Sequence, residues 1–141
     1  MKLKGQWEGY YEYGAGYTLP YFGQRVKMTV SFEGTNDNFK GTIEEEETEF
    51  SVSHLATIQG FCEEDYISFV KTYPVHPFIE EDGESAKTDE TDTLEIDYQG
   101  YIDEKNKALY GSWSIAQLFT DENGQLQESI SEGIWMLRPK A

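Results

Sequence analysis

Apolar and polar residues alternate with a period of two along much of the chain. The clearest run is Val26–Glu33, in which every second residue is apolar. Successive side chains of a strand point to opposite faces, so this run predicts a strand with one buried face and one wet face. A turn-forming cluster follows at 34–38, and the alternation resumes at 39–44. Together the two runs predict a hairpin.

Extended to the whole chain, the pattern predicts eight strands and no amphipathic helix of ordinary length. The predicted strands span residues 6–14, 25–34, 39–46, 54–62, 65–73, 93–102, 107–117 and 131–138. The 74–92 segment between the fifth and sixth strands leaves room for a short helical turn.

The predicted links between strands alternate in length. Those after the first, third, fifth and seventh strands are long, at 15–24, 47–53, 74–92 and 118–130, whereas the others are short. Successive links of an up-and-down sheet lie at opposite ends, so one end carries the tight hairpins and the other the long loops. Closing such a sheet removes its edges. We therefore predict an all-β fold, a single eight-stranded antiparallel up-and-down β-barrel; a two-sheet sandwich is the alternative.

A Gly-x-Trp motif occurs three times, on the first, seventh and eighth predicted strands, with its tryptophans at Trp7, Trp113 and Trp135. Glycine permits close backbone approach and tryptophan fills the space, so all three are predicted to be structural. The motif at 5–7 resembles that of the calycin superfamily of lipocalin-like and avidin-like barrels. The resemblance implies that Arg138, near the end of the last strand, packs over Trp7 at the tight end.

Composition narrows the class of partner. The chain has 141 residues, a length that predicts a single domain over 1–141, and a net charge of −16. Nucleic acid and anionic membrane surfaces are disfavoured, because binding them needs clustered Lys and Arg. The lone cysteine, Cys62, excludes an intramolecular disulfide, and the first residues lack the apolar stretch of a signal peptide. A cytoplasmic location is expected.

The fifth predicted strand offers two orientations. If Ile67 and Phe69 face the interior, Lys71 and Tyr73 do as well, close to the end with long loops. A buried Lys71 then needs a countercharge, which Glu45 on the third strand supplies. In the other orientation Val70 faces inward and Lys71 is solvated.

Further aromatic residues are expected at the same end. Tyr11 and Tyr13 share a face with Trp7, and the glycine-bounded segment 14–23 carries Tyr17 and Tyr21. The loop aromatics either cap a ligand or fold down and fill the mouth. The predicted ligand-binding residues are Tyr11, Tyr13, Tyr17, Tyr21, Lys71 and Tyr73.

No catalytic motif is present, and the spacing of His54 and His76 matches no metal site. No cofactor and no catalytic residue is therefore predicted. The first hypothesis is a binding barrel for a small apolar or aromatic ligand. The second is an enzyme that uses Lys71 or a tyrosine of the same pocket as acid or base. The third is a filled barrel whose outer aromatics, Tyr10, Phe61 and Tyr66, form a homodimer contact.

Overall fold

A computed structural model describes residues 1–79 and 86–141 of the protein. The described residues form strands and no helix. The strands are β1 Gly5–Tyr13, β2 Arg25–Thr35, β3 Asn38–Glu45, β4 Ala56–Glu63, β5 Tyr66–Tyr73, β6 His76–Ile79, β7 Ala86–Asp89, β8 Leu94–Asp103, β9 Ala108–Thr120 and β10 Leu126–Pro139.

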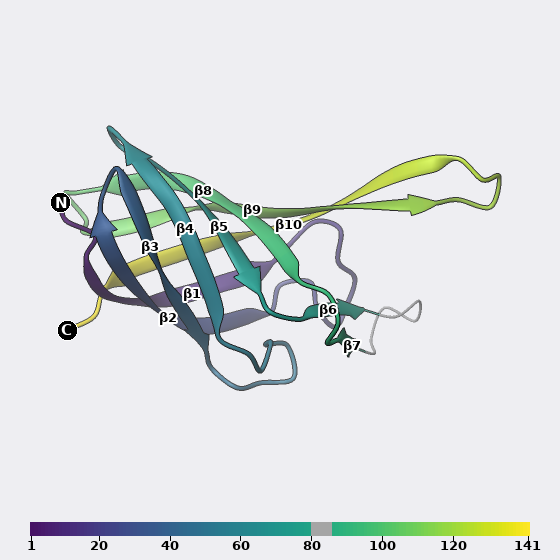
Figure 1. Ribbon diagram of the computed structural model, residues 1–141. Helices are drawn as coiled ribbons and strands as arrows, with labels where there is room; N and C mark the ends of the chain where they lie inside the picture. The colour runs from purple at the N-terminus through teal and green to yellow at the C-terminus, as the bar shows by residue number, and fades with distance from the viewer. Residues whose placement is uncertain (80–85) are drawn as a thin grey trace.

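Eight of these strands close into an antiparallel barrel in the order β1-β10-β9-β8-β5-β4-β3-β2 (Figure 1). Each barrel strand pairs with its neighbour in sequence, and β1 closes the sheet against β10. The up-and-down barrel predicted from the alternation is therefore confirmed. Both chain termini lie at the end with the tight hairpins, and the long loops lie at the other (Figure 1).

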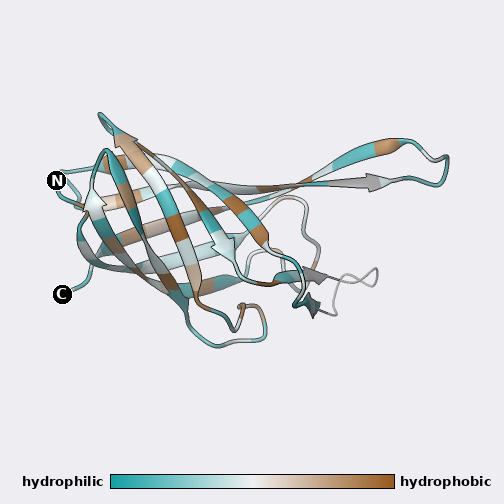
Figure 2. Cartoon of the chain, in the orientation of Figure 1, coloured by the Kyte–Doolittle hydropathy of each residue, from teal (hydrophilic) through white to brown (hydrophobic). Residues whose placement is uncertain are grey.

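Strand periodicity sets the inside of the barrel. On β2 the residues Val26, Met28, Val30 and Phe32 are buried while their neighbours are partly or fully exposed. The same two-residue rhythm of burial runs through β5 and β8. Figure 2 shows apolar positions interspersed with polar ones along each barrel strand, as one wet and one dry face require.

Aromatic side chains fill the barrel toward its tight end. Phe69 lies between Phe32 and Trp135, with ring centroids 6.5 and 5.5 Å away. The N-terminal segment crosses beneath this cluster, where buried Leu3 accepts a 2.7 Å hydrogen bond from the Trp7 indole. Trp7 is thus held in the interior, in keeping with the structural role predicted for it.

Arg138 does not lie where the resemblance placed it. Its backbone is opposite Glu8 rather than Trp7, and its side chain is exposed. Leu137 is buried, so the adjacent Arg138 must point outward. Its guanidinium contacts the sulfur of Met136 at 3.6 Å on the outer face.

Two predicted loops contain strands. β6 and β7 pair as a separate two-stranded sheet within the 74–92 segment, where a helical turn was considered. β9 and β10 run on beyond the predicted boundaries at 117 and 131 and project from the barrel as a two-stranded ribbon (Figure 1). Described side chains of the ribbon are mostly exposed, so no buried face marks it in the sequence.

Candidate functional site

The long-loop end of the barrel holds a cavity of about 360 Å³. Its walls come from the barrel strands and from the loops that follow β1, β3 and β5. All six residues predicted to bind a ligand line it: Tyr11, Tyr13, Tyr17, Tyr21, Lys71 and Tyr73. The alternation and the loop positions predicted this end of the barrel for all six, although for Lys71 and Tyr73 only in one of the two orientations considered for their strand.

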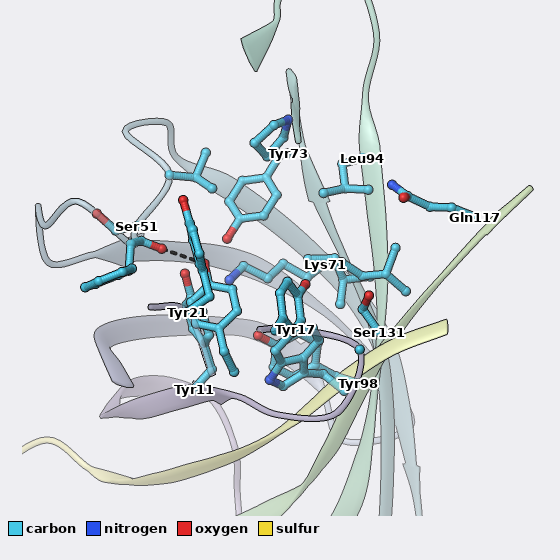
Figure 3. A pocket seen from close by; sticks show the side chains of 18 of the residues that line it. Tyr11, Tyr17, Tyr21, Ser51, Lys71, Tyr73, Leu94, Tyr98, Gln117 and Ser131 are labelled. Atoms are coloured by element: carbon cyan, nitrogen blue, oxygen red, sulfur yellow. Dashed lines mark hydrogen bonds between the residues drawn. The ribbon is translucent and has the colours of Figure 1, made fainter. Parts of the chain in front are cut away.

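Lys71 is fully buried, which settles the two orientations of β5 in favour of the inward one. Its ammonium nitrogen lies 3.0 Å from Oε2 of Glu45, and both side chains are shielded from solvent. The countercharge expected from β3 is thus confirmed. Figure 3 shows the Lys71 side chain reaching into the space among the labelled tyrosines.

Tyrosine rings surround the ammonium group. Its nitrogen lies 4.4 Å from the ring centroid of Tyr11, 4.8 Å from that of Tyr73 and 5.6 Å from that of Tyr98. Ring faces carry negative charge density, so these contacts stabilise a cation that water does not reach.

Glu45 is saturated with hydrogen bonds. Its Oε1 accepts from the Tyr11 hydroxyl at 2.6 Å and from the Val52 backbone N–H at 3.1 Å. Its Oε2 accepts from the Tyr73 hydroxyl as well as facing Lys71. Burial alone would raise the pKa of Glu45, but the Lys71 ammonium and these hydrogen bonds outweigh it and lower the pKa. The carboxylate is therefore held ionised.

Lys71, by contrast, is left with unused donors. Although it is paired with Glu45 by charge, its ammonium makes no hydrogen bond of good geometry with any described residue. Burial lowers the pKa of Lys71, and the attraction of Glu45 offsets this only in part. A buried ammonium with free N–H groups is expensive, so this is a place where a ligand acceptor is favourable.

The three Gly-x-Trp tryptophans are not equivalent. Trp7 donates to Leu3, and Trp135 donates to backbone carbonyls on β8 and β9 at 3.2 and 3.1 Å. Trp113 lines the cavity, and its buried indole N–H has no partner among the described residues. The structural role predicted for Trp113 is therefore incomplete, since it also forms part of the cavity wall.

Gly133 of the third motif makes room for this indole. A Cβ there would lie 1.9 Å from the carbonyl oxygen of Glu12 and 2.5 Å from the Trp113 ring. No side chain fits at that distance. Gly133 on β10 therefore allows β1 to approach closely on one side and the Trp113 ring of β9 to pack against it on the other.

The aromatic loop after β1 covers part of the mouth without filling the cavity. Tyr17 and Tyr21 fold onto Tyr13, with ring centroids 4.8 and 5.3 Å from it. Tyr21 is buried, whereas Leu19 of the same loop is 74% exposed. The tyrosines pack down, as one of the two alternatives for this loop expected, but an open space remains beneath them, and the capping of a ligand stays a prediction.

Several lining residues were missed by the sequence reasoning. Phe50 and Val52 come from the loop after β3, which has no periodic pattern to place them. Leu94, Ile96 and Tyr98 come from β8, whose strict alternation could have identified them.

The other described residues considered for chemistry do not come together in a site. No group of three His, Cys, Asp or Glu side chains suited to a metal ion occurs in the described part of the chain. His54 lies in the loop before β4, and His76 lies on β6 opposite Asp89. Burial raises the pKa of the Cys62 thiol to about 11, with Asp37 adding to the effect.

No helix within residues 1–79 and 86–141 is long and apolar enough to cross a membrane.

The fold and the site define an eight-stranded up-and-down barrel with an aromatic cavity at one end and a buried Lys–Glu pair in its wall. Comparison with protein-family models, curated proteins and solved structures gave no significant match to this chain.

Proposed function

We propose that the protein binds a small, partly apolar ligand in the cavity at the long-loop end of the barrel. The observation that carries the proposal is the pair of buried N–H donors in the cavity wall, Lys71 Nζ and Trp113 Nε1, which have no hydrogen-bond partner among the described residues. Small-molecule sites are mostly apolar hollows of ~300–1,000 Å³ with a few fixed polar groups. A cavity of about 360 Å³ with two free donors fits that description.

The polar groups of the cavity wall limit the chemical class of ligand that the cavity would accept. Glu45, the buried acceptor, already receives hydrogen bonds from two tyrosines and a backbone amide. The buried groups of the wall that lack a partner among the described residues are donors, so the ligand carries an acceptor. The rest of the wall is largely aromatic and aliphatic, as at Trp113, Ile96 and Ile115. We therefore propose a ligand with an apolar or aromatic body and one acceptor directed toward Lys71.

We also propose that the barrel is a lipocalin-like member of the calycin superfamily. The up-and-down order and the inward tryptophan of Gly5-Gln6-Trp7 at the start of β1 support this. The outward Arg138 departs from the pattern of that superfamily. The proposed binding role stands on the cavity and does not depend on this assignment.

Titration with a neutral fluorescent probe, N-phenyl-1-naphthylamine, tests the binding role. We expect one saturable site on the wild type. Leu94→Trp places a larger side chain in the cavity and should weaken binding at least ~10-fold, which corresponds to about 1.4 kcal/mol of binding free energy. The matched control is Leu126→Trp on the ribbon, where the side chain is 69% exposed and outside the cavity lining. Absence of saturable binding, or equal loss in both variants, would refute the proposal.

A second candidate role, a homodimer contact, is favoured by a row of side chains on the outer face. Tyr66, Tyr101, Tyr110, Met136 and Tyr10 lie opposite one another in register on five adjacent strands. Tyr101 is 57% exposed, and exposed aromatic patches are typical of protein contacts. The row itself carries no carboxylate, and Arg25 and Arg138 contact Tyr10 and Met136 in it, so pairing through this row avoids opposing carboxylates within a chain of net charge −16.

Sedimentation velocity over a concentration series tests this second role. We expect a dimer at high concentration that is lost in Tyr101→Ser and kept in Leu126→Ser, which removes a similarly exposed side chain from the ribbon. A strict monomer at every concentration excludes it.

A further inference from the structure

Lys71 differs in its surroundings from every other lysine of the chain. The others are exposed, whereas Lys71 is fully buried in the cavity wall. Its nitrogen carries free N–H groups, sits among tyrosine rings and has a single buried anion 3.0 Å away. A lysine in such a place is the kind that reacts as an amine with carbonyl compounds.

We propose that Lys71 forms a reversible imine with an apolar or aromatic aldehyde held in the cavity, and that Glu45 is the counterion of the resulting iminium. This rests on the proposed binding function, and it specifies the acceptor of the ligand as an aldehyde carbonyl.

Glu45 is placed to take part in the proton transfer. The reaction needs the neutral amine, and Oε2 of Glu45, at 3.0 Å, is the nearest base to the ammonium. Burial lowers the pKa of Lys71, so the loss of a proton is easier than for an exposed lysine. The hydrogen bonds from Tyr11 and Tyr73 hold Glu45 in position before and after the transfer.

The step is balanced without any further reactant. The ammonium proton passes to Glu45, and the amine lone pair forms a C–N bond to the aldehyde carbon. The carbonyl π bond breaks, and the oxygen takes a proton from the nitrogen to give a neutral carbinolamine. Glu45 then returns its proton to the hydroxyl, the C–O bond breaks, water leaves and the nitrogen lone pair forms the C=N bond. The product iminium keeps the single positive charge of Lys71, and Glu45 ends as the carboxylate, so the charge of the site is unchanged.

The charge of the site favours a neutral carbonyl over a carboxylate ligand. Lys71 is already paired with Glu45, so an added carboxylate would be a second anion near one cation. Glu49 also lines the cavity, and the whole chain carries −16. An aldehyde adds no charge, and its oxygen accepts from the free donors until the C–N bond forms.

The probe for the test is 1-naphthaldehyde, with 1-naphthalenemethanol as the analogue that has the same ring system but no carbonyl. The wild type is incubated with the aldehyde and cyanoborohydride, which reduces iminium ions and spares the free aldehyde, and the reduced adducts are mapped by peptide mass spectrometry. We expect labelling of Lys71 at least ~10-fold above that of any exposed lysine, because the cavity concentrates the aldehyde at one amine. Prior addition of the alcohol should suppress it.

Two variants sharpen the test. Lys71→Arg keeps the charge beside Glu45 but cannot form an imine, so cavity labelling should disappear while binding of the alcohol, followed by tryptophan fluorescence, persists. Lys27→Arg on the outer face is the matched control and should leave labelling unchanged.

The outcomes separate the two proposals. Binding of the alcohol together with no enrichment of label on Lys71 would overturn the imine and leave the binding function standing. Binding of neither compound, together with no binding of N-phenyl-1-naphthylamine, would overturn both. The wild-type peptide map decides the first question even if Lys71→Arg does not fold.

Discussion

Removal of one partner of the Lys71–Glu45 pair should destabilise the barrel strongly and unequally. Loss of one member of a buried ion pair typically costs about 3–5 kcal/mol, because the other charge stays buried without its partner. In Lys71→Met, Glu45 still receives hydrogen bonds from Tyr11, Tyr73 and Val52. We therefore expect a loss of ~3 kcal/mol, at the lower end of that range.

Glu45→Gln should cost more, about 4–5 kcal/mol. The ammonium of Lys71 then has no anion and no well-formed hydrogen bond to a described residue, and only the tyrosine rings remain. Glutamine keeps the shape but only one acceptor oxygen, so either Tyr11 or Tyr73 also loses its acceptor, which adds to the loss of the charge. In the double variant no buried charge remains, and its loss should be at least ~2 kcal/mol smaller than the sum of the single losses.

Urea denaturation at pH 7, followed by tryptophan fluorescence, measures these losses. With a slope of about 2 kcal/mol/M, a loss of ~3 kcal/mol lowers the midpoint by about 1.5 M. The difference between wild type and variant should persist in 1 M salt, since a pair shielded from water is weakly screened. Losses under ~0.5 kcal/mol, the size expected at unremarkable surface sites, or single losses that simply add, would refute the reasoning.

The pH dependence of Lys71→Met gives an independent check. The folded protein lowers the pKa of Glu45 below its ordinary value of 4.5, so this group stabilises the fold above pH 4.5 and the contribution is lost as pH falls through the lowered pKa. Without Lys71, the effect of burial on the pKa of Glu45 meets less opposition, and that pKa rises. The variant should therefore lose less stability than the wild type on acidification below neutral pH, because protonation of Glu45 no longer breaks an ion pair and instead removes an unpaired buried charge; an equal or larger loss would contradict this.

Three further predictions follow from other parts of the structure. Gly133→Ala should lower the free energy of unfolding by at least ~3 kcal/mol, because its Cβ would lie 1.9–2.5 Å from backbone and ring atoms. Gly23→Ala has open space around it and should lose only the ~1–2 kcal/mol that a side chain costs at positive φ. Urea midpoints of the two variants measure the difference. The pKa of Cys62 is about 11 against an ordinary 9.0, so the thiol carries about 100-fold less thiolate at pH 8, of which the greater nucleophilicity of that thiolate recovers up to about tenfold. Native protein should therefore react with Ellman's reagent ~10–100-fold more slowly than urea-unfolded protein, and equal rates would contradict this. Burial raises the pKa of Tyr11, Tyr73 and Tyr98, so their stabilising contribution is present below pH 10 and lost above it. The urea midpoint should therefore be lower at pH 11 than at pH 9, and an unchanged midpoint would argue against the burial of these three side chains.

The sequence was a good guide where a strand has one buried face. The alternation placed all eight barrel strands and put Trp7 and Tyr11 on the inner side, whereas for Lys71 it left two orientations open and the structure decided for the inward one. The alternation failed in the ribbon of β9 and β10, where the described side chains are mostly exposed and backbone pairing extends the strands to Thr120 and Leu126. The resemblance likewise misplaced Arg138, although the parity of its own strand, with buried Trp135 and Leu137, points it outward.

The amino-acid sequence by itself determined which side chains of a strand share a face and which barrel end carries the long loops, but it left open which face of the fifth strand is the inner one. Both follow from local geometry, since side-chain direction repeats every two residues and successive links alternate between ends. The tertiary structure alone decided what those inward side chains meet. Lys71 meets Glu45 across the interior, the loop residue Val52 completes the carboxylate, and Trp113 is left with a free N–H. These contacts join segments far apart in the chain, and they depend on strand register and barrel closure, which no single strand encodes.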